Sequence, residues 1–278
     1  MCERTESLVN RQEILSKITN DEDRILVSRL FDKIEFCNKR NSIEHTEFLD
    51  MRQRQLLEKI LFDIKYSNYV AYGGYKTAER TILIFYPSKL EDVFAENRFD
   101  FNTIFSVINI LLPNELKGMY SHRTYLSGII KTGIRREKVG DILSNKNGAN
   151  IIVLKDSIEY VLDGLKTLTR FGKSELRELK LQDLEIEEPK TIVTNAIIPS
   201  MRIDSLVSEM AKTSRAKAAE IIKEERVFIN HELVVKSSKE AKENDIVTIR
   251  GKGKFKVGAI INSTKKGNLV VQIEKYIS

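Results

Sequence analysis

Residues 200–258 read SMRIDSLVSEMAKTSRAKAAEIIKEERVFINHELVVKSSKEAKENDIVTIRGKGKFKVG, and they decide the fold of the C-terminal part of this 278-residue chain. Apolar residues recur at helical spacing over 203–210 and again over 218–222. Ser214 lies before the second run, where its hydroxyl can accept a hydrogen bond from a first-turn amide. The sequence therefore predicts two short helices that meet at a tight corner.

Basic side chains surround this corner and a following turn. Runs rich in β-branched residues predict strands at 227–229, 246–249, 255–261 and 269–273. The turn at 250–254 carries two glycines, which let a backbone approach a phosphate closely. The alternative interpretation of these basic residues is a solvated helix face. For Arg215, the alternative is an ion pair with a residue such as Glu209. The expected RNA-binding residues are Arg202, Lys212, Ser214, Arg215, Lys217, Lys223, Arg250, Lys252 and Lys254.

The order and spacing of these residues resemble the S4-type domain, a small RNA-binding domain named after the fourth protein of the small ribosomal subunit. The resemblance is carried by Arg202-Ile203-Asp204, Leu206, Ser214-Arg215, Ala218, Ile222, Val227, Ile229-Asn230 and Asn244-Asp245-Ile246 followed by Arg250. It implies structured RNA as the ligand. Glu225 and His231 stand where the domain usually has glycine, and Asn230 is expected to form the turn because asparagine tolerates a positive φ.

The basic excess lies entirely on the C-terminal part of the chain. Residues 200–278 hold 16 lysines and arginines against 10 aspartates and glutamates, which equals the net charge of +6 of the whole chain. The first 199 residues are neutral, so the distribution favours a polyanionic partner for the C-terminal part. Cys2 and Cys37 are the only cysteines, and their spacing indicates neither a metal site nor a disulfide. Because the sequence has no long apolar run, we expect a cytoplasmic protein that does not bind a membrane. We also expect no small-molecule cofactor.

The first 182 residues predict two further domains of the α+β class. Helical patterns lie over 8–65, with Asp50 as the expected N-cap of a helix over 52–64, and strands lie at 69–72 and 82–86. Residues 99–182 show a strand-helix-strand-strand-helix-strand order typical of a ferredoxin-like, RNA-recognition-type domain. Its Lys/Arg-Gly-Phe-Gly-Phe signature for base stacking is absent. The expected boundaries are 1–90, 91–182, an acidic linker at 183–198 with Glu187, Glu188 and Pro189, and 199–278.

Two segments invite other functional interpretations. Gly73-Gly74-Tyr75-Lys76-Thr77 lacks the glycine-lysine-serine/threonine triplet of a phosphate loop, so we expect a turn between strands. His122 has no carboxylate partner at a recognisable spacing, which favours a structural or RNA-facing role over catalysis. We assign no catalytic residue. A second RNA contact is expected at His122, Arg123, Arg135, Arg136 and Lys138.

Several segments of the first two domains look like the hallmark segments of the YlmH family. They are Phe48-Leu49-Asp50 with Arg52-Gln53, Tyr72 to Tyr75 with Ala78-Glu79-Arg80, Ser121 to Gly128, and Gly133 to Ile142. The family usually has leucine or isoleucine followed by glycine at this place, and Ser127-Gly128 keeps only the glycine. The resemblance implies a non-enzymatic bacterial protein that binds ribosomal RNA and tRNA on the large ribosomal subunit and assists quality control of stalled nascent chains.

Two other classes of function remain open at this point. S4-type domains are also appended to RNA-modifying enzymes, although residues 1–199 show no motif for a methyl donor, for ATP or for pseudouridine synthesis. The YlmH family has also been linked with cell division, which keeps a protein-binding scaffold as an alternative.

Overall fold

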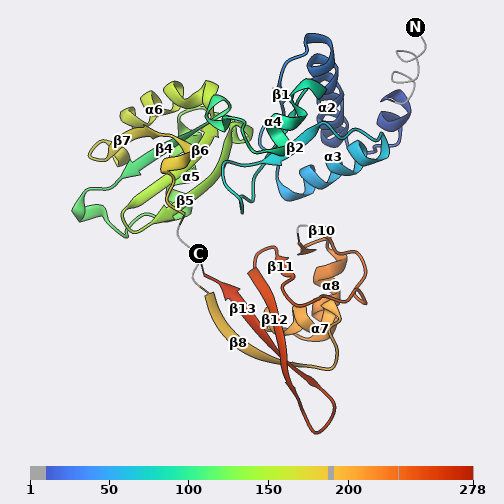
Figure 1. Cartoon of the computed structure of the whole chain (residues 1–278). Helices are drawn as coiled ribbons and strands as arrows, with labels where there is room; N and C mark the ends of the chain where they lie inside the picture. The colour runs from blue at the N-terminus through green and yellow to red at the C-terminus, as the bar shows by residue number, and fades with distance from the viewer. Residues whose placement is uncertain (1–10, 187–190, 231, 278) are drawn as a thin grey trace. The chain divides into compact units, whose positions relative to one another are not determined.

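The structure, a computed structural model, describes residues 11–186, 191–230 and 232–277. The chain divides into two compact units, Met1–Ile186 and Glu187–Ser278 (Figure 1). Helices and strands are mixed in both units, as the α+β prediction requires. Predictions that involve Cys2, Glu187, Glu188, Pro189 and His231 lie outside the described residues.

The first unit begins with helices beside a small antiparallel sheet. Residues 11–16 are helical, and helices α2 (Asp21–Arg40) and α3 (Met51–Asp63) follow. The Asp50 side chain accepts a hydrogen bond from the Gln53 amide at 2.8 Å, which confirms the predicted cap of α3. The sheet has the order β1-β3-β2, and the short helix α4 (Glu91–Ala95) comes after it. Its strands are β1 (Glu44–His45), β2 (Tyr69–Tyr72) and β3 (Ile82–Phe85).

The predicted strand-helix-strand-strand-helix-strand order is confirmed in the second half of this unit. The four strands form one antiparallel sheet with the order β5-β6-β4-β7, the order in which a ferredoxin-like fold places its strands. The elements are β4 (Phe105–Leu111), α5 (His122–Lys131), β5 (Val139–Asn145), β6 (Gly148–Leu154), α6 (Ile158–Thr167) and β7 (Glu175–Leu179). Ser157 precedes α6, and its hydroxyl donates to Asp156 Oδ1 at 2.7 Å and makes no cap bond.

The two faces of this four-stranded sheet pack against different parts of the chain. One face, with Ile108, Ile110 and Ile151, packs against α5 and α6. The other face contributes Phe105 and Val107 from β4 and further residues from β6 to a second core. That second core also contains residues of the N-terminal part, namely Phe48, Ile82, Ile84 and Tyr86.

This shared core differs from the expectation of separate domains over 1–90 and 91–182. The β3 residues Ile82 and Ile84 and the β6 residues Ile152 and Leu154 bury one another, all with an exposed fraction of 1% or less. Each half alone would expose this apolar surface to water, at a cost of roughly 25 cal/mol per Å². Residues 1–186 therefore form one unit.

The second unit is a six-stranded antiparallel sheet packed against the predicted helix pair. Helices α7 (Ile203–Met210) and α8 (Arg215–Lys223) bury Leu206, Val207 and Ala218 against the sheet. The strand order is β10-β9-β11-β12-β13-β8. The strands are β8 (Thr191–Ile198), β9 (Val227–Ile229), β10 (Glu232–Leu233), β11 (Ile246–Ile249), β12 (Gly253–Ser263) and β13 (Leu269–Tyr276).

The expected linker at 183–198 is only partly correct, because residues 191–198 form strand β8. Thr191 pairs with Tyr276 and Ile198 pairs with Leu269, so β8 lies along the whole of β13. Ala196 and Ile198 belong to the core of this unit. The run Thr-Ile-Val-Thr-Asn-Ala-Ile-Ile is rich in β-branched residues, so its composition favours a strand although acidic residues and a proline precede it.

The turn before β10 has the predicted geometry. Asn230 has a φ of 49°, and its side chain accepts from the Ile246 amide at 2.8 Å and donates to Asp245 Oδ1 at 2.7 Å. Glu225, which stands where the resembling domain usually has glycine, has a φ of 56°. Glu225 lies between α8 and β9, and because such a φ disfavours a residue with a Cβ, this chain keeps the backbone there at some cost in free energy.

Candidate nucleic-acid interface

The corner between α7 and α8 places a capped helix start at the protein surface. The Ser214 hydroxyl accepts from the Lys217 amide at 3.2 Å, which confirms the predicted N-cap of α8. Lys212, just before it, has a φ of 50° and is exposed. This left-handed residue reverses the chain between the two helices, so α8 starts directly beside the end of α7.

A buried carboxylate holds two arginines at this corner. Asp204, in the first turn of α7, has a side chain that is only 8% exposed. Arg202 Nη2 donates to Asp204 Oδ2 at 2.9 Å, and Arg215 Nη2 donates to Oδ1 at 3.0 Å and to Oδ2 at 3.1 Å. The Asp204 cluster, as we call Arg202, Asp204 and Arg215, therefore joins the start of α7 to the start of α8.

The charges of the Asp204 cluster explain both its stability and its suitability for an anion. Burial of Asp204 opposes ionisation, but hydrogen bonds from Arg202 and Arg215 outweigh burial and lower the pKa of this carboxyl. Two guanidinium groups against one carboxylate leave one net positive charge. The Arg215 side chain is 48% exposed, and both of its bonds to Asp204 come from Nη2, so its other nitrogens can meet a ligand.

The contacts of Asp204 change the expected partner of Arg215, and they give Asp204 a role that the sequence did not assign. The ion pair that was the alternative interpretation of Arg215 is present, but its partner is Asp204 and not Glu209. The sequence contains the signal in Arg202-Ile203-Asp204, where an aspartate sits in the first turn of a predicted helix. The crossing of α7 and α8, which sequence periodicity does not give, decides which basic side chains reach it.

The other predicted RNA-binding residues fall into two groups along α8. Lys217 lies in the first turn and forms an exposed ion pair with Glu220 at 2.7 Å. Lys223 is exposed at the opposite end of α8, roughly 12 Å along the helix axis from Arg215. Arg202, Lys212, Ser214, Arg215 and Lys217 thus belong to the corner, and Lys223 belongs to the other end.

The basic turn between β11 and β12 adjoins the far end of α8. Arg226, just after α8, donates from Nη2 to the carbonyl oxygen of Arg250 at 2.8 Å. The Arg250 guanidinium lies over the Phe228 ring at 5.0 Å, and Lys254 Nζ lies 5.5 Å from the Tyr276 ring centroid. Lys252 is exposed, and Gly251 has the positive φ of 78° that the turn requires. The turn that carries Arg250, Lys252 and Lys254 is therefore hydrogen-bonded to Arg226, which follows the end of α8 that carries Lys223.

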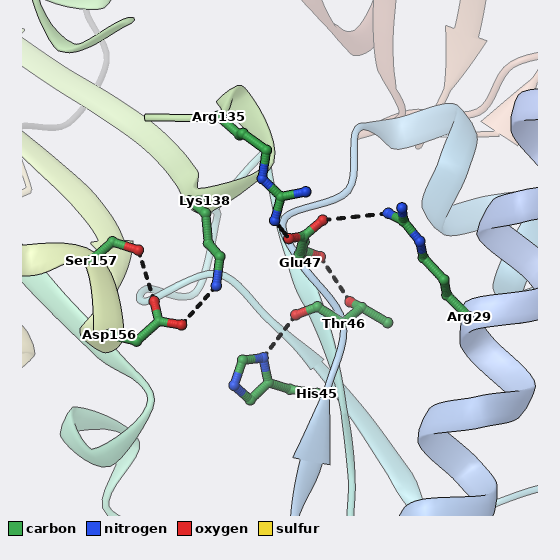
Figure 2. A network of polar contacts seen from close by, with 8 residues as sticks. All are labelled: Arg29, His45, Thr46, Glu47, Arg135, Lys138, Asp156 and Ser157. Carbon is green, nitrogen blue, oxygen red and sulfur yellow. Dashed lines mark hydrogen bonds and ion pairs between the residues drawn. The ribbon is translucent and has the colours of Figure 1, made fainter. Parts of the chain in front are cut away.

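In the first unit, two of the five residues expected to form a second RNA contact, Arg135 and Lys138, form ion pairs with acidic residues (Figure 2). Glu47 forms ion pairs with Arg135 and with Arg29 of α2, the latter at 3.7 Å. Lys138 pairs with Asp156 at 2.7 Å, and Asp156 also accepts from Ser157. The pair of Glu47 with Arg135 links the N-terminal part to the ferredoxin-like part, whereas the pair of Lys138 with Asp156 lies within the ferredoxin-like part.

Arg136 and His122 lie in a second polar cluster. Arg136 donates from Nη1 to the carbonyl oxygens of Val139 and Gly140, the latter at 3.2 Å. Burial, together with the nearby Arg80, lowers the pKa of Arg136 to about 10. Burial and Arg136 likewise lower the pKa of His122, which favours the neutral imidazole. Arg123 is exposed at the start of α5.

Sequence reasoning missed the centre of this second cluster, Asp141. Its carboxylate accepts from the Tyr75 hydroxyl at 2.9 Å and from the amides of Glu79 and Arg80 at 2.7 and 3.1 Å. Burial raises the pKa of Asp141 despite these bonds. Arg80 donates to the carbonyl oxygens of Phe48 and Val139. The segment 73–80 is thus a turn between β2 and β3, as predicted, and its backbone amides are hydrogen-bonded to Asp141 of β5.

Metal and membrane sites do not emerge from the part of the chain that the structure describes. Within residues 11–186, 191–230 and 232–277, no three His, Cys, Asp or Glu side chains come together as a metal site would need. Over the same ranges, no helix has the length and apolar content to cross a bilayer.

Comparisons with known proteins agree with the sequence resemblance. Residues 97–185 match the family model described as "Putative RNA-binding domain in YlmH". A curated relative from Bacillus subtilis (strain 168), "Ribosome-associated protein quality control protein P2", is 25% identical over 256 residues, 91% of this chain and 95% of that protein. The solved structure "Cell division protein ylmH from Streptococcus pneumoniae" is similar with a TM-score of 0.47 and 20% identity, over 62% of this chain and 98% of that one. The matched domain and the nearly full-length relative support the resemblance of this chain to the YlmH family.

Proposed function

We propose that this protein is a non-enzymatic RNA-binding factor that associates with the ribosome. The observation that carries the proposal is the Asp204 cluster, in which a buried carboxylate fixes Arg202 and Arg215 at the exposed start of α8. The description of the matched domain as RNA-binding and the name of the curated relative as ribosome-associated support the same role.

The chemistry of the corner suits a phosphate of structured RNA. A guanidinium group offers planar, paired donors that match a phosphate, and it stays charged at all physiological pH values. The first-turn amides of α8 add partial positive charge at the same place. Because Asp204 already holds Arg202 and Arg215 in place, less side-chain entropy is lost on binding than for free arginines.

The finer assignment concerns the site on the ribosome. We propose that the S4-type corner contacts ribosomal RNA and tRNA on the large subunit, in the cytoplasm, and thereby assists quality control of stalled nascent chains. The resemblance to the YlmH family and the name of the Bacillus subtilis relative, a ribosome-associated quality control protein, support this assignment. Lys223, Arg250, Lys252 and Lys254 form a second group of phosphate contacts, and Arg123 with His122 and Arg136 forms a third on the first unit.

The salt dependence of binding tests the proposal. We expect the whole chain to bind a structured RNA, such as purified large-subunit ribosomal RNA, with an affinity that falls steeply as salt rises. Each phosphate contact adds roughly 0.7 to 0.9 to the slope of log affinity against log salt. Arg215→Ala should reduce this slope by about one contact, whereas Arg98→Ala should leave it unchanged.

Arg98 is a matched control because it is an exposed arginine of the first unit that pairs with Glu96 and belongs to none of the proposed contact groups. Its substitution gives the same net charge as Arg215→Ala. A wild-type affinity that does not depend on salt would rule out a phosphate-binding role. Equal slopes for the two variants would remove Arg215 from the site.

A further inference from the structure

Only part of one face of the four-stranded sheet is covered. On that face, Val107 pairs across the sheet with Ile152 and with Leu179, and this row lies in the core shared with the N-terminal part. The next row in register consists of Leu143 (β5), Asn150 (β6), Asn109 (β4) and Arg177 (β7). The following row places Leu111 opposite Gly148 and Glu175. Neither of these two rows belongs to that shared core.

Hydrogen bonds link the three polar residues of this row, and Arg177 at one end of the network is exposed. Asn109 Nδ2 donates to Asn150 Oδ1 at 2.7 Å, and Arg177 Nε donates to Asn109 Oδ1 at 2.9 Å. Asn109 is buried at 7% exposure, whereas the Arg177 side chain is 51% exposed. The network therefore uses the Asn109 amide to fix its two neighbours. The Asn150 Nδ2 group and the outer nitrogens of Arg177 remain as donors at the open face.

Apolar and basic side chains surround this row. Leu111 and Leu143 are partly exposed, so an apolar surface lies next to the amide donors. Gly148, in the row of Leu111, has no side chain, and a Cβ there would clash with the Ile110 carbonyl oxygen. At the same end of the sheet, the Gly118 amide donates to the Lys146 carbonyl oxygen at 2.7 Å, which brings the turns that carry Lys117 and Lys146 together. Both lysines are exposed, as are Glu115 and Glu175.

We propose that the open row of Leu143, Asn150, Asn109 and Arg177 binds a base of single-stranded RNA. The base packs on the leucines and under the Arg177 guanidinium, and the Asn150 amide donates to its edge. Lys117 and Lys146 meet the flanking phosphates. This inference rests on the proposed RNA-binding function and adds to it a second, unpaired RNA segment, bound by the first unit rather than by the corner at α8.

The chemistry of the row favours a base over an isolated phosphate. Aromatic rings, which most sheet platforms use to stack bases, do not occur in the two open rows, so a flat guanidinium takes that role. A paired amide network reads a base edge, whereas a phosphate would prefer several converging cations. Glu175 Oε1, 3.9 Å from Arg177 Nη1, is too far away to hold the guanidinium. Double-helical RNA is disfavoured because its bases are not free to lie on a flat sheet.

Site-resolved crosslinking of the whole chain tests this inference. A ten-nucleotide oligonucleotide that contains 4-thiouridine is irradiated with the protein, and crosslinked peptides are identified by mass spectrometry. We expect crosslinks in peptides that contain residues 109–111, 143–150 or 175–177. Asn150→Asp keeps the acceptor for Asn109 but replaces the donor with a negative charge, and Arg177→Gln removes the guanidinium. Each should lower these crosslinks by about tenfold, the range of one base contact.

Two controls separate this inference from the proposed function. Arg98→Ala removes an exposed, carboxylate-paired arginine elsewhere in the first unit and should leave crosslinking of the row unchanged. Arg215→Ala should weaken binding of structured RNA without changing crosslinks at the row. A protein that binds structured RNA but gives no crosslink at the row, or crosslinks in Asn150→Asp and Arg177→Gln that equal those of wild type, would overturn the inference alone. A protein that binds neither probe would overturn both.

Discussion

At the scale of single residues, Asp204 is the group on which the proposed interface depends. The sequence predicts that Arg202, Ser214 and Arg215 lie near one another, because capping and helical periodicity are local. It does not predict which carboxylate orients the two arginines, since this depends on how α7 and α8 cross. Asp204 is buried beside α8 and 11 residues before Arg215, so the ion pair is a tertiary contact.

Substitution of Asp204 distinguishes orientation from simple charge. Asp204→Asn keeps the shape of the side chain and adds one net positive charge to the corner. If charge alone bound RNA, affinity would rise. We expect affinity to fall several-fold instead, because both arginines lose their charged anchor, and we expect the free energy of unfolding to fall by about 1–2 kcal/mol. RNA binding and chemical denaturation, measured on the same variant, check the two effects, and tighter binding would contradict the role of Asp204.

The same residue gives a pH dependence with a defined sign. In the folded chain the pKa of Asp204 lies below its ordinary value of 3.8, so the unfolded chain binds protons more readily in that range. The stability that Asp204 contributes is therefore complete above about pH 4 and is lost as pH falls through the folded pKa. The difference in denaturation midpoint between wild type and Asp204→Asn should shrink between pH 5 and pH 3. A difference that stays constant over this range would contradict an ionised Asp204 cluster.

At the scale of elements, most helices and strands follow from local patterns. The capped helices α3 and α8 lie where the sequence predicts them, and β5 and β6 follow one another as the predicted order of elements requires. The prediction of a linker over 191–198 is wrong. The acidic residues and the proline just before β8 favour a linker, but the β-branched run that follows them forms a strand. The polar row at Asn109 was not predicted either, because its members come from four strands whose pairing is a long-range property.

Strand β8 should matter for the stability of the second unit. A fragment of residues 199–278 lacks β8, so it leaves the edge of β13 unpaired and removes Ala196 and Ile198 from the core. A fragment of residues 187–278 keeps both. We expect the longer fragment to unfold at a clearly higher temperature in circular dichroism, since burial of a side chain such as Ile198 contributes roughly 1.5–3 kcal/mol. Equal melting temperatures would show that β8 is dispensable.

Helix α5 offers a test of independent folding. A Cβ at Gly128 would lie 2.4 Å from Phe171 Cε2, a buried ring, so Gly128→Val should disrupt the core between α5 and α6. Gly172→Ala is the matched control, because its nearest neighbour is an ordinary 3.5 Å away. In amide correlation spectra, Gly128→Val should lose the dispersed signals of the first unit and retain those of residues 191–277. Loss of both sets would contradict two independent units.

At the scale of the whole molecule, the chain combines a nearly neutral first unit with a basic second unit. Composition alone predicts that the C-terminal part meets the polyanion. What composition does not show is that residues 1–186 form one unit, because the core between β3 and the four-stranded sheet joins segments far apart in the sequence. That core covers part of the sheet face on which an RNA-recognition-type domain would stack bases. It explains in physical terms why the aromatic stacking signature is absent from β4 and β6.

The central claim is that the Asp204 cluster attaches this protein to ribosomal RNA, and cosedimentation tests it most directly. Wild type, Arg215→Ala, Arg215→Lys and the control Arg98→Ala are each mixed with purified large ribosomal subunits and separated on sucrose gradients. We predict that wild type and Arg98→Ala sediment with the subunit, and that Arg215→Ala stays folded but binds about 1–3 kcal/mol more weakly. Its loss of stability should be smaller than that of Asp204→Asn, because Arg202 still pairs with the Asp204 carboxylate. Arg215→Lys should recover binding only in part, because lysine keeps the charge but not the fork. Normal cosedimentation of Arg215→Ala, or wild type that stays at the top of the gradient, would contradict the claim.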